Sequence, residues 1–192
     1  MDSYLSIDLD YFNDRDKSLS LFFDKVFQLN LPIYVSCFHD QLLQHVNISG
    51  CRTLYNIDYH SDLSDGVNDL NEGNWVNYVT WKAIGKYYWH RPNTVARRNN
   101  YCHLNTNPFY GVTPGGWRIA KQWVGLGINW KSIRSVGCCL SPDWTQKRPA
   151  LTELMYRLRM PSWWGKCSTY DKNRDIPGYL LDKDGIRDIV KV

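Results

Sequence analysis

The sequence predicts an α/β fold in three layers, with a mostly parallel sheet that is covered by helices on both faces. Short runs of β-branched and aromatic residues alternate along the chain with segments whose apolar residues recur at helical spacing. Strands that alternate with helices in this way imply right-handed crossovers between parallel strands. The 192 residues suffice for one sizeable core but not for two ordinary domains. We therefore expect a single domain that spans residues 1–192.

The first part of the chain contains three strand-like runs separated by helical segments. Apolar residues at positions 19, 22, 23 and 26 share one helical face. The expected elements are, in order, a strand at 4–9, a helix at 17–29, a strand at 32–37, a short helix at 41–46 and a strand at 52–57.

The second part of the chain is less regular. We expect a helix at 74–85 that closes at Gly85, a strand at 86–90, a long irregular loop at 91–116, a buried strand at 133–140, and a helix at 150–159 preceded by Pro149. The segment after residue 159 shows no pattern that assigns it to an element.

The composition is that of a folded protein without a membrane span. Hydrophobic residues make up 43% and charged residues 22% of the chain, and no uncharged apolar run approaches about 18 residues. The N-terminus lacks the basic stretch and apolar segment of a secretory signal, which favours a cytoplasmic location. The six cysteines have no CxxC spacing, and in that compartment we expect reduced, structural thiols.

Charge is unevenly distributed along the chain. Residues 1–80 contain 12 acidic and 4 basic side chains, whereas residues 81–192 contain 7 and 19. Clustered carboxylates favour cation binding, although two charged faces that pair across the fold would give the same counts. The basic residues of the second part are scattered, with only Arg97 and Arg98 adjacent, and no nucleic-acid-binding motif occurs. We therefore expect no nucleic-acid partner.

Acidic and histidine side chains follow each of the first three predicted strands. Because ligands bind beyond the carboxyl ends of strands in parallel sheets, these residues are expected to meet at one edge. Side chains at i, i+2 and i+4 of an extended stretch lean to one side, so those of each motif share a direction. The sequence predicts a metal site with six ligands: Asp8, Asp10, His39, Asp58, His60 and Asp62.

The ligand types favour two Mn²⁺ ions. Carboxylate oxygens with a minority of imidazoles suit Mn²⁺ better than Mg²⁺ or Zn²⁺, and one cation does not need six protein ligands. Taken alone, a DxD at a strand end is more often a turn or a helix cap, and a single histidine such as His39 is more often a loop residue. Their coincidence at three strand ends favours the metal site.

These motifs resemble those of the ureohydrolase superfamily, the arginases and their relatives. Residues 58–62 (DYHSD) resemble the DAHxD motif, residues 6–10 (SIDLD) resemble the SxDxD motif, and His39 resembles the histidine of the GGDHS motif. The resemblance implies an arginase-like fold in which Asp8 and Asp58 bridge two Mn²⁺ ions. It further implies that His39 and Asp62 complete one ion, and that Asp10 and His60 complete the other.

The chain departs from the arginase pattern in three ways. The SxDxD element precedes the DxHxD element, the chain is much shorter, and the glycines before the histidine are missing. A shortened chain with permuted motif order is similar to the small peptide arginases that modify ribosomally made precursor peptides, the proteusin type among them. The resemblance implies conversion of peptidyl arginine to ornithine and urea, with an arginine-containing precursor peptide as partner.

The substrate-contacting residues follow from the same resemblance. Asp62 is expected to act in catalysis by accepting a hydrogen bond from the attacking hydroxide. A cationic guanidinium also needs a carboxylate partner, for which Asp143 and Glu72 are the candidates. Asn74, Trp75 and Trp144 lie beside these acids in sequence and are expected to contact substrate. Asp143 could equally be a turn residue after Pro142, Glu72 a helix-start acid, and the tryptophans core residues.

Two other functions are compatible with the pattern. The same superfamily contains Zn²⁺-dependent deacetylases and other amidohydrolases, which would hold one tight Zn²⁺ in place of two Mn²⁺. A non-catalytic, metal-stabilised peptide-binding module would use cations only to neutralise the acidic edge. The sequence leaves the oligomeric state and the identity of the peptide open.

Overall fold

The computed structural model of the chain describes most of the N-terminal half and four shorter parts of the C-terminal half. The described residues are 1–13, 16–63, 69–80, 84–90, 128–142, 144–145, 149–159 and 178–190. The predicted loop at 91–116 lies outside them.

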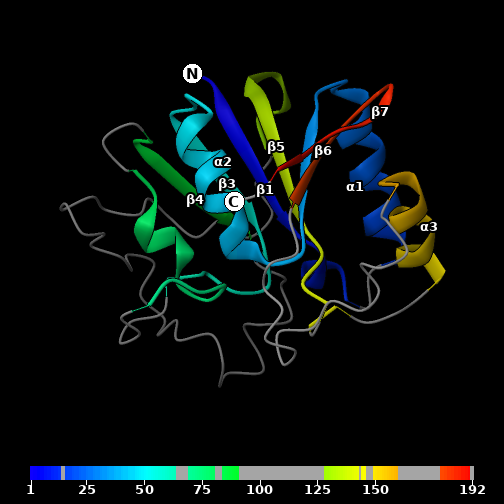
Figure 1. Ribbon diagram of the computed structural model, residues 1–192, viewed down its shortest axis with the longest axis horizontal. Coiled ribbons are helices and arrows are strands. Elements are labelled where there is room, and N and C mark those ends of the chain that lie inside the picture. The colour runs from blue at the N-terminus through cyan, green and yellow to red at the C-terminus, as the bar shows by residue number, and fades with distance from the viewer. Residues whose placement is uncertain are drawn as a thin grey trace.

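A seven-stranded sheet forms the centre of the described structure, in the order β4-β3-β1-β5-β2-β6-β7 (Figure 1). The first five strands in this order are parallel to one another. Strand β6 runs antiparallel to both of its neighbours, β2 and β7. The strands are β1 (Ser3–Asp8), β2 (Ile33–Ser36), β3 (Thr53–Ile57), β4 (Lys86–His90), β5 (Ile133–Cys139), β6 (Gly178–Asp182) and β7 (Gly185–Val190). The predicted mostly parallel α/β sheet is therefore confirmed.

Helices cover both faces of this sheet. Helices α1 (Asp16–Gln28) and α3 (Pro149–Arg157) pack on the face that contains Leu5 and Ile7 of β1, whereas α2 (Leu42–Ile48) packs on the face that contains Tyr4 (Figure 1). Because successive side chains of a strand point to opposite faces, Ser6 and Asp8 follow Tyr4 onto the α2 side. The C-terminal half of β1 thus directs the polar side chains of Ser6 and Asp8 toward the α2 face.

Most predicted elements are confirmed, with one clear error. The strands at 4–9, 32–37, 52–57, 86–90 and 133–140 and the helices at 17–29, 41–46 and 150–159 all occur with ends shifted by a few residues. Over residues 74–80 the predicted helix at 74–85 is wrong, because the chain forms the 3₁₀ turn η3 (Trp75–Tyr78) there and becomes extended at Val79. Besides the local bonds of this turn, two long-range bonds hold the segment, from Val76 N to Asp62 O and from Thr80 N to Asn47 Oδ1.

The hairpin of β6 and β7 was not predicted from the sequence. Its turn contains Asp184 and Gly185, and the side chain of Asp182 accepts hydrogen bonds from the backbone N–H groups of both. An Asp-Gly pair between apolar residues is a common hairpin signal, which the sequence does contain. The hairpin extends the parallel sheet beyond β2.

The described cysteines are buried thiols, as expected, namely Cys37, Cys51, Cys138 and Cys139. Cys102 and Cys167 lie outside the described residues. Among the helices that the structure describes, none has the length and apolar composition needed to cross a membrane.

A close approach between β5 and β1 gives a test of the core. A Cβ at Gly137 would collide with the hydroxyl of Tyr4 and lie 3.0 Å from Leu42. That hydroxyl is hydrogen-bonded to His45 Nδ1 at 2.7 Å, so it cannot move without losing a buried bond. We expect Gly137→Ala to lower the free energy of unfolding by about 1–3 kcal/mol in urea denaturation.

Gly85→Ala is the matched control for this substitution. A Cβ at Gly85 meets nothing within 4 Å, so its effect on the free energy of unfolding should stay within about 0.5 kcal/mol. Equal stabilities of the two variants would show that the Tyr4 contact does not restrict β5.

Candidate metal centre

The six predicted ligands lie at the carboxyl ends of three parallel strands, as the sequence predicts. Asp8 ends β1, Asp58 follows β3, and His39 begins the 3₁₀ turn η2 (His39–Gln41) after β2. The three strands are not consecutive in space, because β5 lies between β1 and β2. The site is therefore bordered by four strand ends, and the contribution of β5 was not part of the expected ligand set.

The two acidic motifs adopt the same local turn. Asp8 Oδ1 accepts a hydrogen bond from Asp10 N at 3.1 Å, and Asp58 Oδ1 accepts one from His60 N at 2.8 Å. Such side-chain-to-backbone bonds two residues apart are typical of Asp in turns. Here each bond also fixes the direction of the residue at i+2, which is itself a predicted ligand. The turn interpretation and the ligand interpretation of these motifs are thus compatible.

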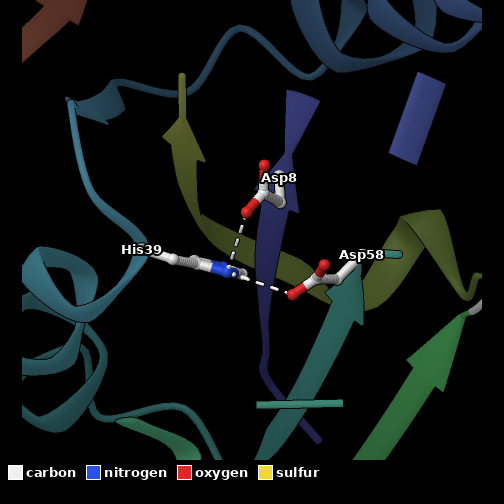
Figure 2. Close-up of side chains that lie close together, drawn as sticks. All are labelled: Asp8, His39 and Asp58. Atoms are coloured by element: carbon white, nitrogen blue, oxygen red, sulfur yellow. Dashed lines mark ion pairs between the residues drawn. The ribbon is translucent and has the colours of Figure 1, made fainter. Parts of the chain in front are cut away.

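Two groups of side chains bring three ligand atoms within 4.8 Å of one another. Asp8, His39 and Asp58 form the His39 group, and Asp10, Asp58 and His60 form the His60 group. Figure 2 shows the His39 group, with the imidazole between the carboxylates from β1 and β3. Asp58 belongs to both groups, so its carboxylate is shared between them. Among the described residues Asp8 belongs to one group only, which differs from the bridging role that the resemblance implies.

His39 is the most enclosed nitrogen ligand. Its Nδ1 lies 3.3 Å from Asp8 Oδ2, 3.1 Å from Asp58 Oδ2 and 2.8 Å from Asp62 Oδ2, yet it makes no aligned hydrogen bond. Its Nε2 is 2.8 Å from Ser6 Oγ. When the neutral ring carries its proton on Nε2 and donates it to this hydroxyl, Nδ1 is left to bind a cation. A buried nitrogen that faces three carboxylates in this way fits a metal ligand.

The loop that carries His39 is held by Gln41. Gln41 Oε1 accepts hydrogen bonds from the backbone N–H groups of Cys37 and Phe38, both at 3.1 Å. The direction of the imidazole therefore follows from the sequence immediately around it.

His60 forms the open side of the site. Its Nδ1 lies 3.3 Å from Asp10 Oδ2 and 3.9 Å from Asp58 Oδ1, and 32% of its side chain is exposed, whereas the other five predicted ligands are buried. Trp144 is also exposed, and its ring lies 5.8 Å from the imidazole of His60 in an edge-on contact. A substrate would reach the site from this side.

Strand β5 supplies a supporting residue that the sequence did not indicate as functional. Ser141 follows β5, and its hydroxyl donates a 2.6 Å hydrogen bond to Asp8 Oδ2. Ser141 has a φ of 45°, a conformation that is unfavourable for a residue with a Cβ and is often found at functional sites. Its position directly after a predicted buried strand was the available signal.

Two of the predicted substrate contacts form hydrogen bonds inside the protein. Trp75 is fully buried, and its indole N–H donates a 2.6 Å hydrogen bond to Asp62 Oδ2. Asn74 is also buried, and its side chain bonds to backbone groups of Asp69 and Asn71 within its own loop. Both side chains are therefore buried and bonded within the protein, and contact of Asn74 and Trp75 with substrate stays a prediction.

The remaining predicted site residues are placed in part. Glu72 is half-buried in the same loop, outside both groups of candidate ligands. Asp143 lies outside the described residues, although its neighbour Trp144 contacts His60. Asp62 lies beside His39 without belonging to either group of mutually close ligand atoms.

Burial and repulsion from neighbouring acids raise the pKa values of Asp10 and Asp58. Burial, followed by the charge of Asp8, raises the pKa of Asp10 to about 7. Burial and the charge of Asp62 raise the pKa of Asp58 well above its usual range. Both acids therefore resist ionisation without a neighbouring positive charge.

The pKa values of both histidines are raised, although burial alone would lower them. Burial opposes the protonated form of His60, but the hydrogen bond to Asp10 and the charge of Asp58 outweigh it and raise the pKa to about 9. Burial also opposes protonation of His39, and the contacts with Asp62, Asp58 and Asp8 again raise its pKa. Protons on the imidazoles thus supply positive charge where a metal ion would.

The donor set fits two divalent cations. Four carboxylates balance the charge of two dications when both imidazoles are neutral, and no described cysteine belongs to either ligand group. Oxygen with some nitrogen and no sulfur suits a hard cation such as Mn²⁺ better than Zn²⁺ in a thiolate site. The residues present could therefore hold a metal ion.

The pKa shifts predict how metal binding depends on pH. The raised pKa of Asp10 gives the metal-free protein stability that is present below its usual pKa of about 4 and lost as pH rises through about 7. The raised pKa of His60 gives stability that is present below about 6.5 and lost as pH rises through about 9. Metal binding requires both groups deprotonated. The melting temperature difference between Mn²⁺-loaded and metal-free protein should therefore widen as pH rises from about 6 to about 9.

Calorimetric titration with Mn²⁺ near pH 7, in buffers of different ionisation enthalpy, measures the linked protons directly. We expect proton release on binding. A binding enthalpy that is independent of the buffer would contradict the charge state assigned to the site.

Comparisons of the chain with protein-family models, with curated proteins and with solved structures found no match. The functional assignment accordingly depends on the geometry of the site and on the pattern of its residues.

Proposed function

We propose that this chain is a two-metal hydrolase of the arginase type that converts peptidyl arginine to ornithine and urea. One observation supports this proposal above the others. Asp58 belongs to both ligand groups, which gives a shared carboxylate between two cation positions at the open edge of a parallel sheet. The choice of arginine as substrate is supported by the resemblance of residues 6–10 and 58–62 to ureohydrolase motifs.

The chemistry that two Mn²⁺ ions supply in such sites is activation of a water molecule for attack on an otherwise unreactive carbon. The proposal assigns the His39 group and Asp62 to one ion and the His60 group to the other. Asp62 is proposed to accept a hydrogen bond from the attacking water, because its carboxylate faces the His39 group. Trp75 occupies one lone pair of Asp62 Oδ2 and so limits the directions in which that carboxylate can accept.

The substrate guanidinium requires a carboxylate on the open side of the site. Ser141 contacts Asp8 and Trp144 contacts His60, so described residues before and after Asp143 both border the metal centre. This favours Asp143 over Glu72 as the proposed guanidinium partner. A bidentate carboxylate would orient the planar group and offset its repulsion from two dications. The exposed ring of Trp144 is proposed to pack against the peptide at the entrance.

Metal stoichiometry tests the two-ion assignment. Wild-type protein should bind two Mn²⁺ per chain, measured by elemental analysis and by calorimetric titration. Asp10→Asn should retain one tight ion, because Asp10 belongs only to the His60 group, whereas Asp58→Asn should weaken both.

Asp24→Asn is the surface control for these two variants. Asp24 of α1 pairs with Arg157 of α3 at 3.0 Å, and neither residue belongs to a ligand group. The Asp24→Asn variant should therefore keep both ions bound. One tightly held Zn²⁺ in the wild type, with no second ion, would support the deacetylase alternative and contradict the proposal.

Turnover tests the substrate. Mn²⁺-loaded protein incubated with arginine-containing peptides should release urea and leave the mass of ornithine at the converted position. Asp143→Asn should lower kcat/KM by roughly 100-fold with both ions still bound, because a charged partner of the guanidinium is lost. Glu72→Gln, measured in parallel, should have the smaller effect.

Two results would contradict the assignment of substrate. A fully metal-loaded protein that releases no urea from any peptide of an arginine-containing library would leave a binding module as the better interpretation. Faster turnover of free arginine than of peptides would exclude the peptide-specific activity.

A further inference from the structure

Trp75 contacts two side chains on one side of the metal centre. Its indole N–H donates a 2.6 Å hydrogen bond to Asp62 Oδ2, and its ring lies 4.9 Å from the imidazole of His39 at an angle of 49°. Asp62 Oδ2 is in turn 2.8 Å from His39 Nδ1, so the three side chains form a closed triangle. Within the described part of the chain, Trp75 makes no hydrogen bond or ring contact with the His60 group.

The backbone ties Asp62 to the same turn. Val76 N donates to Asp62 O at 3.3 Å, so η3 binds both the carbonyl and the carboxylate of Asp62. Asp62 has a φ of 53°, a left-handed conformation that a side chain makes unfavourable. The two bonds from η3 help to keep this conformation and with it the direction of the carboxylate.

We propose that Trp75 is a positioning residue for the ion on the His39 side of the centre and not for the ion on the His60 side. The inference rests on the two-ion site of the proposed function and not on its arginine substrate. The buried indole N–H would set the carboxylate of Asp62, and the ring would set the plane of His39, before any ion arrives.

The geometry separates this role from ordinary core packing. A phenyl ring at position 75 would keep an apolar side chain in the buried cluster that contains Trp75 but would remove the hydrogen bond to Asp62. Asp62 would then lose its only indole donor and could turn away from His39. Partners that orient metal ligands in this way typically change metal affinity by about 10- to 100-fold when removed.

The test is a Mn²⁺ titration of Trp75→Phe, followed by calorimetry and by electron paramagnetic resonance. We expect one of the two ions to bind about 10- to 100-fold more weakly than in the wild type, and the other to bind unchanged. At two equivalents of Mn²⁺, the signal of a coupled ion pair in the wild type should become that of isolated ions in the variant. Combining Trp75→Phe with Asp10→Asn identifies the affected ion, because the single variant Asp10→Asn retains only the His39 side.

Trp89→Phe is the matched control. Trp89 is buried in β4, and its indole N–H donates at 3.0 Å to the backbone carbonyl of Asp58, not to a ligand side chain. Both variants lose one buried indole donor, so both should lower the melting temperature. Only Trp75→Phe should weaken the His39-side ion selectively.

A second measurement covers the case in which Trp75→Phe does not fold. In Asp10→Asn labelled with ¹⁵N-tryptophan, the indole N–H signal of Trp75 should shift when Zn²⁺, as a diamagnetic substitute, fills the remaining site. An indole signal that does not respond to the ion would overturn the proposal. Wild-type affinity for both ions in Trp75→Phe, or equal weakening of both in the two tryptophan variants, would also overturn it.

Two measurements distinguish a failure of this inference from a failure of the proposed function, namely urea release and the number of ions bound by the wild type. A protein that binds two ions but releases no urea would refute the arginine substrate and leave the role of Trp75 open to confirmation by affinity alone. A protein that binds only one ion in the wild type would refute the two-ion site itself.

Discussion

Four carboxylates share the interior of one sheet edge, and their repulsion is the constraint that organises the residues around them. Burial and like charge raise the pKa values of Asp10 and Asp58, so the ionised cluster needs positive charge or many donors. The donors come from separate parts of the chain: Ser141 to Asp8, Asn56 to Asp58, and Trp75 to Asp62. Hydrogen bonds of this kind reduce the cost of burying the acids but do not neutralise them. Two divalent cations would neutralise the four carboxylates.

The topology of the sheet explains why these groups meet. Strands β3, β1, β5 and β2 are adjacent and parallel, so their carboxyl ends open onto the same edge. Within these four strands, β1 lies between β3 and β5, and its end carries Asp8 and Asp10. These two acids therefore lie between the segment after β3, which contains His60, and the segment after β2, which contains His39. Strand β4 supports the turn after β3 through Tyr87. The hydroxyl of Tyr87 accepts a hydrogen bond from Asn56 and donates one to the backbone carbonyl of Ser61. That chain of bonds fixes the turn at residues 58–62 from beneath.

The proximity of the candidate ligands within each motif could be predicted from sequence because their geometry is local, whereas the residues that bond to them could not. Asp8 and Asp10, like Asp58 and His60, are two residues apart, and a side-chain bond within each turn sets their directions. Trp75 is 13 positions from Asp62, and Ser141 is 133 positions from Asp8, so no spacing rule links them. The departure from the predicted helix over residues 74–80 has the same origin, since Val76 N bonds to Asp62 O and Thr80 N bonds to Asn47 Oδ1, residues that no local pattern links. The hairpin at 178–190 differs, because its Asp-Gly signal was present in the sequence.

The two halves of the centre are unequal, and this inequality bears on how a hydrolase of this kind would work. His39 is enclosed by Ser6, Asp62 and Trp75, whereas His60 is one-third exposed beside the exposed Trp144. A buried ligand group held by several hydrogen bonds keeps its geometry when substrate binds, at the cost of slow ion entry. An exposed group offers the opposite balance. With Asp58 common to both, the buried half would fix the position of the shared carboxylate, and the exposed half would meet the substrate.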